Sequence, residues 1–199
     1  WLGYLVDKWL LNLAFTWSTW EVEKFIAFAP QTANGGPWAD DEINMIVNRV
    51  LSGSQFRVDY NRVYIVWFSY GSLWLRNYLA LAGKAQIFAA AVPSAFVPTF
   101  NPVHCNAWGS GLAIYAMSEA DTYNASYTSS PSNFTGFLSW LNNCIPAFSP
   151  PVIWEIMTGR NHIEMYHFYW QQAYTWFQWK NVYNWLLDHS RNYASGGAG

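Results

Sequence analysis

Short apolar runs alternate with amphipathic stretches along the chain, a pattern that predicts an α/β domain. Uninterrupted apolar runs rich in β-branched and aromatic residues indicate strands covered on both faces, as in a parallel sheet. Such runs occupy Val63 to Phe68, Phe88 to Val92, Leu112 to Met117 and Val152 to Met157. Phe25 to Ala29 predicts one more strand, which would end in the turn-forming stretch that follows Pro30.

Apolar residues recur at helical spacing between and after these runs. Asp40 or Asp41 could cap a helix whose apolar positions follow the i, i+3, i+4 pattern: Ile43, Ile46, Val47, Val50 and Leu51. Leu73 to Leu81 and Trp176 to His189 predict two further helices, the second of them amphipathic. We therefore expect a mostly parallel sheet with helices on both faces, in one domain over residues 1–193, followed by a flexible Gly/Ala/Ser tail over residues 194–199.

Composition narrows the range of partners. Of the 199 residues 52% are hydrophobic, which is enough to bury one substantial core. The 10 basic and 12 acidic side chains form no long block of either sign and no basic cluster, so neither a nucleic-acid groove nor a polybasic membrane patch is indicated. No apolar stretch approaches the roughly 20 residues needed to span a bilayer. We expect a small or weakly charged partner, no nucleic acid and no membrane span; the sequence does not indicate an oligomeric state.

Two features favour an extracellular protein. Asn124 and Asn133 each begin an Asn-X-Ser/Thr sequon in a polar stretch, where glycans attach in secreted chains. Cys105 and Cys144 form an even pair that could close a disulfide in an oxidising compartment, although two buried free thiols are the simpler alternative. The expectation is a secreted glycoprotein with one disulfide.

Ser69, Asp121 and His162 follow three of the predicted strands, in the order nucleophile, acid and base. A serine on a sharp strand-to-helix turn exposes its hydroxyl and lets the next backbone N–H, here that of Tyr70, face a developing oxyanion. A serine before a helix is more often only a cap, and the other two residues could be surface groups. Glu119 is a possible substitute for the acid.

Other chemistries find little support. His162 and His167 are five residues apart, which is off-face on a helix, and no Cys-x-x-Cys pair or carboxylate cluster accompanies them. Gly35 and Gly36 are followed by Pro37, which lacks the N–H that a phosphate cradle uses. We therefore expect no metal and no cofactor.

The chain resembles extracellular esterases of the α/β-hydrolase superfamily, the group of feruloyl esterases, polyhydroxybutyrate depolymerases and predicted peptidases. The similar segments are Phe25 to Gln31, Gly36 to Trp38, Phe56 to Ile65, Phe88 to Pro93, Ser118 to Asp121, Gly159 to His162 and Tyr183 to Arg191. The resemblance implies an α/β-hydrolase fold that hydrolyses polysaccharide-linked acyl or feruloyl esters, or polyesters. It also sets Trp38, Tyr70 and Trp170 near the cleft, where rings could stack on the substrate.

The chain departs from this family in three places. Trp67 stands where the family has glycine, two residues before Ser69, and a bulky side chain is hard to accommodate in so tight a turn. Ser72 replaces a second glycine that often follows the turn. Between Trp1 and Trp20 nothing matches the His-Gly-rich loop that supplies the second oxyanion donor, as expected of a chain that lacks the family's first strands. A serine peptidase and a non-catalytic protein that binds carbohydrate or another ligand therefore stay as alternatives.

Overall fold

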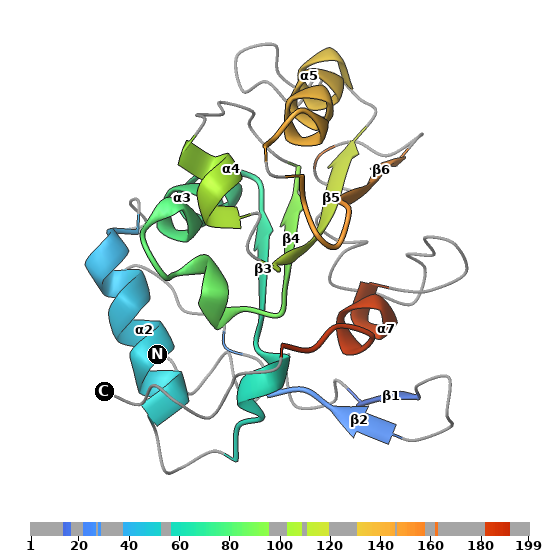
Figure 1. Cartoon of the computed structure of the whole chain (residues 1–199). Helices are drawn as coiled ribbons and strands as arrows, with labels where there is room; N and C mark the ends of the chain where they lie inside the picture. Colours follow the sequence, from blue (N-terminus) through green and yellow to red (C-terminus); the bar gives the residue numbers. More distant parts are fainter. Residues whose placement is uncertain are drawn as a thin grey trace.

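Four parallel strands form the centre of the protein in the computed structural model (Figure 1). The structure describes residues 14–16, 22–26, 28, 38–52, 57–95, 103–108, 111–119, 131–145, 147–157, 162 and 182–191. The sheet runs in the order β3-β4-β5-β6, so that strands consecutive in the chain are neighbours in space. Its members are β3 (Tyr64–Phe68), β4 (Ala90–Ser94), β5 (Ala113–Glu119) and β6 (Ile153–Met157).

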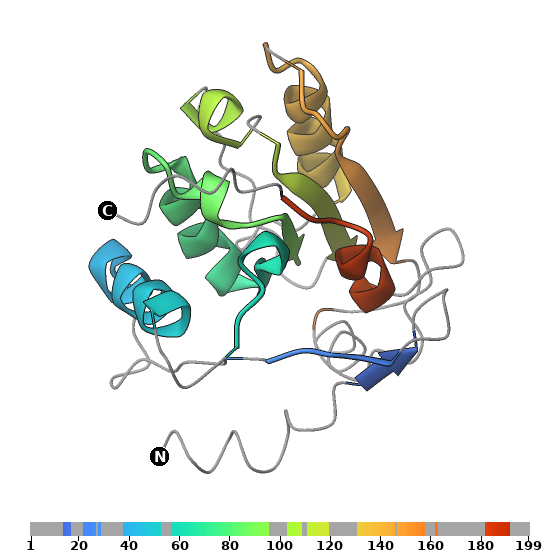
Figure 2. The same cartoon turned by 60° about the horizontal axis from the view of Figure 1, so that its bottom comes forward.

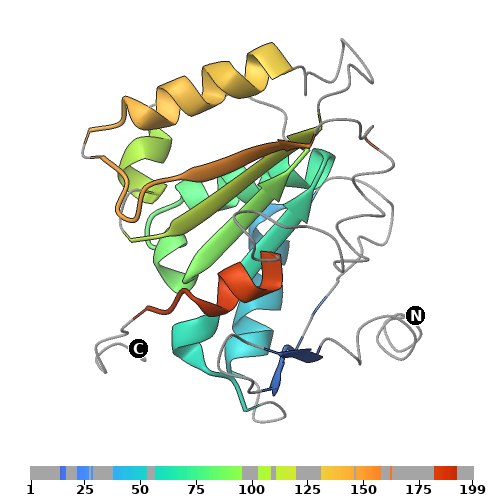
Figure 3. The same ribbon diagram turned by 90° about the vertical axis from the view of Figure 1, so that its right-hand side faces the viewer.

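Side chains alternate between the two faces of the sheet and build two cores. One face packs against helices that precede or connect the strands: α2 (Asp40–Ser52), α3 (Tyr70–Ala80), α4 (Val103–Trp108) and α5 (Pro131–Asn142). The opposite face packs against α7 (Val182–Leu187). Figures 2 and 3 show α5 and α7 on opposite sides of the strands. The predicted α/β class, with helices on both faces of a parallel sheet, is confirmed for the described residues.

Helix α2 begins with three acidic residues and carries Arg49 in its last turn, charges that suit the two ends of the helix dipole. The backbone N–H of Ala39 donates to Glu42 Oε2 at 2.9 Å, the back-bond of a capping box. The predicted Asp40 or Asp41 cap is wrong, because Asp40 is already the first residue of the helix and Ala39 precedes it. Ile43 is the residue of α2 that is fully buried.

A disulfide joins α4 to the turn after α5. Cys105 and Cys144 are bonded, with their Cα atoms 5.4 Å apart, and no described cysteine is free. The bond crosses the helical layer over one face of the sheet, where Cys144 is 4% exposed within the core that also holds Trp108 and Leu141. The disulfide alternative for the two cysteines is therefore confirmed, and it is compatible with an oxidising compartment.

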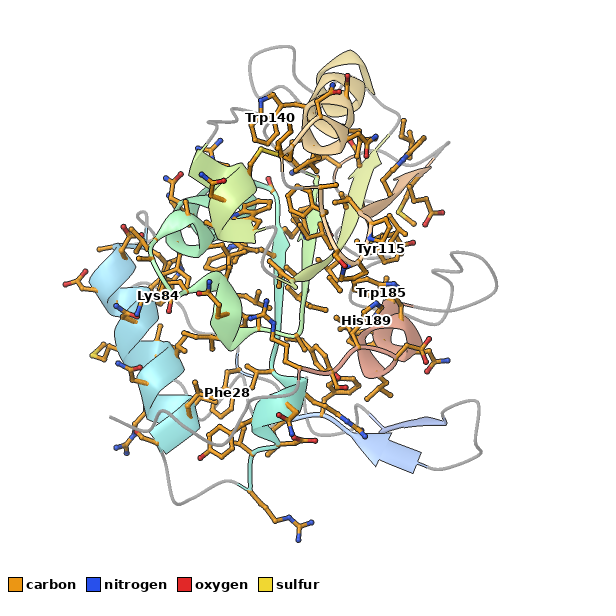
Figure 4. The ribbon with its side chains drawn as sticks, viewed as in Figure 1. Phe28, Lys84, Tyr115, Trp140, Trp185 and His189 are labelled. Atoms are coloured by element: carbon orange, nitrogen blue, oxygen red, sulfur yellow. A yellow bond between two sulfur atoms is a disulfide. The ribbon has the colours of Figure 1, made fainter. Side chains whose placement is uncertain are left out.

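Helix α7 lies on the second face, against Tyr115 of β5. Tyr115 meets Trp185 edge-on at 5.4 Å between ring centroids, and Trp185 in turn lies 4.3 Å from the ring of His189 (Figure 4). The Tyr115 hydroxyl, fully buried, donates to Glu155 Oε2 on β6 at 2.5 Å. These contacts fix the C-terminal segment to the sheet.

The prediction for Phe25 to Ala29 was wrong, because the strand lies earlier. A separate antiparallel pair consists of β1 (Ala14–Thr16) and β2 (Val22–Lys24), and Phe25, Ile26 and Phe28 belong to no strand. The Phe25 ring instead packs between Tyr64 and Tyr183, at centroid distances of 5.9 and 5.8 Å. Short-range hydrophobicity does not distinguish a strand from such an anchor.

Two other predicted boundaries shift. The strand expected to end before Pro93 continues through it to Ser94, because an extended backbone suits proline and the ladder loses only one N–H donor. Within the predicted helix Trp176 to His189, the described part is helical over Val182–Leu187, and His189 lies beyond its end. Residues 176–181 and the predicted tail lie outside the described residues.

Alkaline pH is expected to weaken the contact between α7 and the sheet through Tyr183. Burial raises the pKa of this tyrosine to about 12, above its ordinary 10, because the phenolate would lose its hydration. A raised folded-state pKa means that the stability is fully present below pH 10 and is lost as the pH rises from 10 to 12, by about 3 kcal/mol. Urea unfolding of Tyr183→Phe should show a smaller loss between pH 9 and 11 than the unsubstituted protein. Parallel curves for the two proteins would contradict this.

Candidate functional site

Ser69 occupies the sharp turn between β3 and α3, in a backbone conformation that L-residues rarely adopt. Its φ is 54° and its ψ −128°, close to the first central position of a type II′ turn, which usually carries glycine. Holding serine there costs roughly 1–3 kcal/mol, and such strain collects at functional sites. No capping hydrogen bond is made by the Ser69 side chain, although Ser69 immediately precedes the helix. The simpler interpretation of Ser69 as a helix cap is therefore wrong.

The turn is held in place by the neighbouring strand. Ser69 donates its backbone N–H to the carbonyl oxygen of Ser94 at 2.9 Å, one step beyond the register pair of Phe68 and Ser94. Ala95, which follows Ser94, also has a positive φ of 50° and donates its N–H to Met117 O at 3.0 Å. The strands β3 and β4 are thus each followed by a residue with positive φ whose N–H is hydrogen-bonded to the neighbouring strand. The sequence did not indicate this, because neither residue is the glycine that usually marks a positive φ.

His162 meets Ser69 at this edge. His162 Nε2 and Ser69 Oγ are 2.7 Å apart, the distance of a good hydrogen bond, although 93 residues separate them in the chain. Both residues are half-buried. The sequence-based pairing of these two side chains is what the geometry shows.

A role for His162 as a base requires one particular tautomer. If the Ser69 hydroxyl donates its proton, Nε2 must be the unprotonated ring nitrogen, and the proton then sits on Nδ1. A histidine in that state can accept the hydroxyl proton when Ser69 attacks an electrophile. The Nδ1–H in turn calls for an acceptor, and a carboxylate there would favour the imidazolium.

The ring of Phe68 contacts the imidazole of His162. The ring centroids of Phe68 and His162 are 4.8 Å apart and their planes are tilted by 42°. Phe68 is itself anchored on the core that α7 shares with the sheet. Sequence reasoning gave Phe68 no role beyond the strand, because nothing in the local pattern shows which distant ring will lie on it.

Trp67 fits the turn because Gly71 has no side chain. A Cβ placed on Gly71 would lie 1.4 Å from Trp67 Nε1 and 1.7 Å from Trp67 Cδ1, so the indole occupies the space that a side chain would need. Trp67 also packs on the core beneath α3. The crowding expected from a bulky residue two positions before Ser69 is present: the indole lies tightly against the first turn of α3, in space that only a residue without a side chain leaves open.

The third predicted member follows β5. Strands β5 and β6 end level with each other, at the register pair Glu119 and Met157, and Ser94 at the end of β4 pairs with Met117. The segments after β3, β5 and β6 therefore leave the sheet at one edge, where open parallel sheets usually carry their sites. Glu119 is the last residue of β5, and Asp121 lies outside the described residues.

Other predicted site residues are placed in part. Tyr70 is the first residue of α3, where a backbone N–H has no acceptor within its own helix. Trp38 is half-buried and packs on the core near α2 and α3. Asn133 belongs to the first turn of α5. Trp170 and Asn124 lie outside the described residues.

Comparison with known proteins gives no relative: no protein-family model matches the chain, and no curated protein matches it in sequence. A function for this chain is therefore inferred from its own residues and their geometry.

The described residues contain neither a metal-binding cluster nor a membrane-spanning helix. Among the residues that the structure describes, no group of three or more His, Cys, Asp or Glu side chains is arranged to hold a metal ion. No helix in the described part of the chain is long and apolar enough to cross a bilayer. What the described residues offer chemically is a serine hydroxyl hydrogen-bonded to an imidazole beside the N-terminus of a helix.

Proposed function

We propose that this protein is a serine hydrolase of the α/β-hydrolase fold that cleaves carboxylic esters. The observation that carries the proposal is the 2.7 Å hydrogen bond between Ser69 Oγ and His162 Nε2, made at a strained strand-to-helix turn. A nucleophile and a base within hydrogen-bond reach are the core of acyl-transfer catalysis. The strand order supports it, because nucleophile, acid and base follow β3, β5 and β6 of one parallel sheet.

The first half of the reaction forms an acyl-enzyme. Ser69 Oγ attacks the ester carbonyl carbon while its proton passes to His162 Nε2. The carbonyl oxygen becomes an oxyanion, and the backbone N–H of Tyr70, the first residue of α3, is the proposed donor to it. The carbon–oxygen bond to the alcohol then breaks, and His162 returns the proton to the leaving alkoxide.

Water completes the cycle. His162 takes a proton from a water molecule, whose oxygen attacks the acyl carbon, and the bond to Ser69 Oγ breaks as the proton returns to Ser69. Asp121 is the proposed acceptor for His162 Nδ1–H, which holds the ring in the correct tautomer. Glu119, at the end of β5, is the alternative acid. The cycle uses no cofactor.

The substrate class rests on the resemblance alone. Feruloyl or other acyl esters on polysaccharides, or polyesters, are the proposed substrates, with Trp38 and Trp170 as stacking residues and a secreted glycoprotein as the setting. The alternative of a non-catalytic binding protein rests on Trp67 and on the missing oxyanion loop, and of these two the structure gives Trp67 a packing contact with Gly71. A serine peptidase would share the same triad and differ in the leaving group.

A fluorophosphonate probe tests the nucleophile directly. We expect covalent labelling of the purified protein at the peptide that contains Ser69, read by mass spectrometry. Ser69→Ala should stay unlabelled, whereas Ser139→Ala, at an exposed serine of α5, should label like the unsubstituted protein. A folded, disulfide-bonded sample that takes up no label would overturn the proposed function.

Two carboxamide variants separate the candidate acids. Asp121→Asn should lower kcat for a p-nitrophenyl ester by a factor on the order of 10³–10⁴, because a neutral amide can also donate to Nδ1, which favours the wrong tautomer, and it carries no charge to stabilise the imidazolium. Glu119→Gln should stay within a few-fold of the parent rate. The reverse pattern would assign the acid to Glu119, and full activity in both variants would remove the acid from the mechanism.

A further inference from the structure

Phe68 links the nucleophile strand to the base. It is the last residue of β3, immediately before Ser69, and its ring centroid lies 4.8 Å from that of His162, which follows β6 in the chain. This is the range in which aromatic rings attract one another and in which a cation is drawn to a π-system. The contact adds a second point of attachment for the imidazole, beside its hydrogen bond to Ser69.

The ring contact adds to the hydrogen bond with Ser69 in orienting the imidazole. The bond between Ser69 Oγ and His162 Nε2 sets the position of one nitrogen, and the plane of the ring also depends on what packs against it. A neighbouring ring tilted by 42° restricts rotation of the imidazole and so keeps the Nε2 lone pair aimed at the hydroxyl. Phe68 can do this because its own position is fixed, by the core on the α7 face and by the β3–β4 ladder.

The contact also changes character during the proposed reaction. When His162 takes the proton from Ser69, its ring becomes a cation beside the electron-rich system of Phe68. Attraction between the two is stronger in that state than with neutral imidazole. An interaction that strengthens as the charge develops lowers the activation barrier and leaves the affinity for substrate unchanged.

From this geometry we infer that Phe68 is a positioning residue for His162, which holds the imidazole in line with Ser69 and stabilises its protonated form. The inference rests on the proposed function for its catalytic part. Its structural part, the contact of the two rings, stands apart from catalysis and can be measured without a substrate.

Phe68→Leu and Phe68→Tyr separate this role from simple core packing. Leucine keeps an apolar side chain of similar size but has no ring, whereas tyrosine keeps the ring. With a p-nitrophenyl ester we expect Phe68→Leu to lower kcat about fivefold with KM changed less than twofold, the size of effect of one cation–π contact. Phe68→Tyr should stay within twofold of the parent in both constants.

A matched variant controls for general loosening of the core. Phe25→Leu removes another partly buried ring from the same core, where it contacts Tyr64 and Tyr183. It should lower the melting temperature to a similar degree as Phe68→Leu while leaving kcat close to the parent value. Equal losses of kcat in Phe68→Leu and Phe25→Leu, or a loss that tyrosine does not rescue, would overturn the inference.

Proton NMR tests the ring contact independently of activity. The chain has four histidines, so the imidazole C–H resonances of His162 can be assigned by their loss in His162→Gln. A ring at the observed distance displaces these resonances by its ring current, and we expect Phe68→Leu to move them towards the positions of an ordinary solvated histidine, and Phe68→Tyr to leave them displaced. Resonances that stay unchanged in Phe68→Leu would show that the rings are not in contact, even in a protein that labels with fluorophosphonate. If the displacement is present but no labelling occurs, the contact stands and the proposed function fails.

Discussion

Ser69→Gly is expected to give a more stable protein than Ser69→Ala, although both lose hydrolytic activity. Each variant removes the hydroxyl and its hydrogen bond to His162, so this loss cancels in the comparison. Alanine must keep the φ of 54°, whereas glycine adopts it without a steric penalty. Glycine relieves roughly 1–3 kcal/mol of strain, but it also gives the unfolded chain more conformational entropy, which offsets part of this gain. The free energy of unfolding of Ser69→Gly should therefore exceed that of Ser69→Ala by about 1 kcal/mol.

Urea denaturation followed by tryptophan fluorescence measures this difference, and p-nitrophenyl ester hydrolysis measures the activity. Loss of the nucleophile should reduce kcat by at least a factor on the order of 10⁴ in both variants. Equal stability of the glycine and alanine variants would show that the turn is not strained. Retained activity in either one would exclude Ser69 as the nucleophile. The combination tests whether the conformation that destabilises this turn is kept for the chemistry.

Sequence patterns predicted the central strands and helix α2 well because burial there is two-sided or strictly periodic. Val63 to Phe68 had no polar interruption, and its side chains do pack against both cores, one on each face of the sheet. The pattern could not place Phe25, since a single apolar residue gains the same free energy whether it lies in a strand or wedges between Tyr64 and Tyr183. Local patterns contain no information on which distant surface receives a side chain.

In the candidate site, too, some features were predictable from the sequence and others were not. Chain order and the strand-to-helix turn were sufficient to pair Ser69 with His162, because parallel strands bring their carboxyl ends to one edge. The fit of Trp67 against Gly71 could not be predicted, since it depends on how closely α3 approaches β3 rather than on either residue alone. The contact of Phe68 with His162 was missed for a similar reason: two residues so far apart in the chain meet only through the fold.

Gly71→Ala should be strongly destabilising, and the cause should be Trp67. The new methyl group would lie 1.4 Å from an indole atom, a clash that requires either the helix or a core-packed ring to move. Overpacking of this kind usually costs about 1–3 kcal/mol, and so short a contact should reach 3 kcal/mol or more. Gly71 has no positive φ, so backbone strain does not contribute. Urea unfolding measures the loss.

A double-mutant cycle isolates the cause. In a Trp67→Ala background the clash is absent, and Gly71→Ala should instead stabilise by about 0.5–1 kcal/mol, the usual gain of alanine over glycine in a helix. Gly136→Ala in α5 is the matched control, because its Cβ would meet no atom within 4 Å and should bring the same small gain in the parent chain. A large loss from Gly71→Ala that persists without Trp67 would place the constraint in the backbone of the turn. Reversal of sign would show that Trp67 and Gly71 together form the turn that presents Ser69.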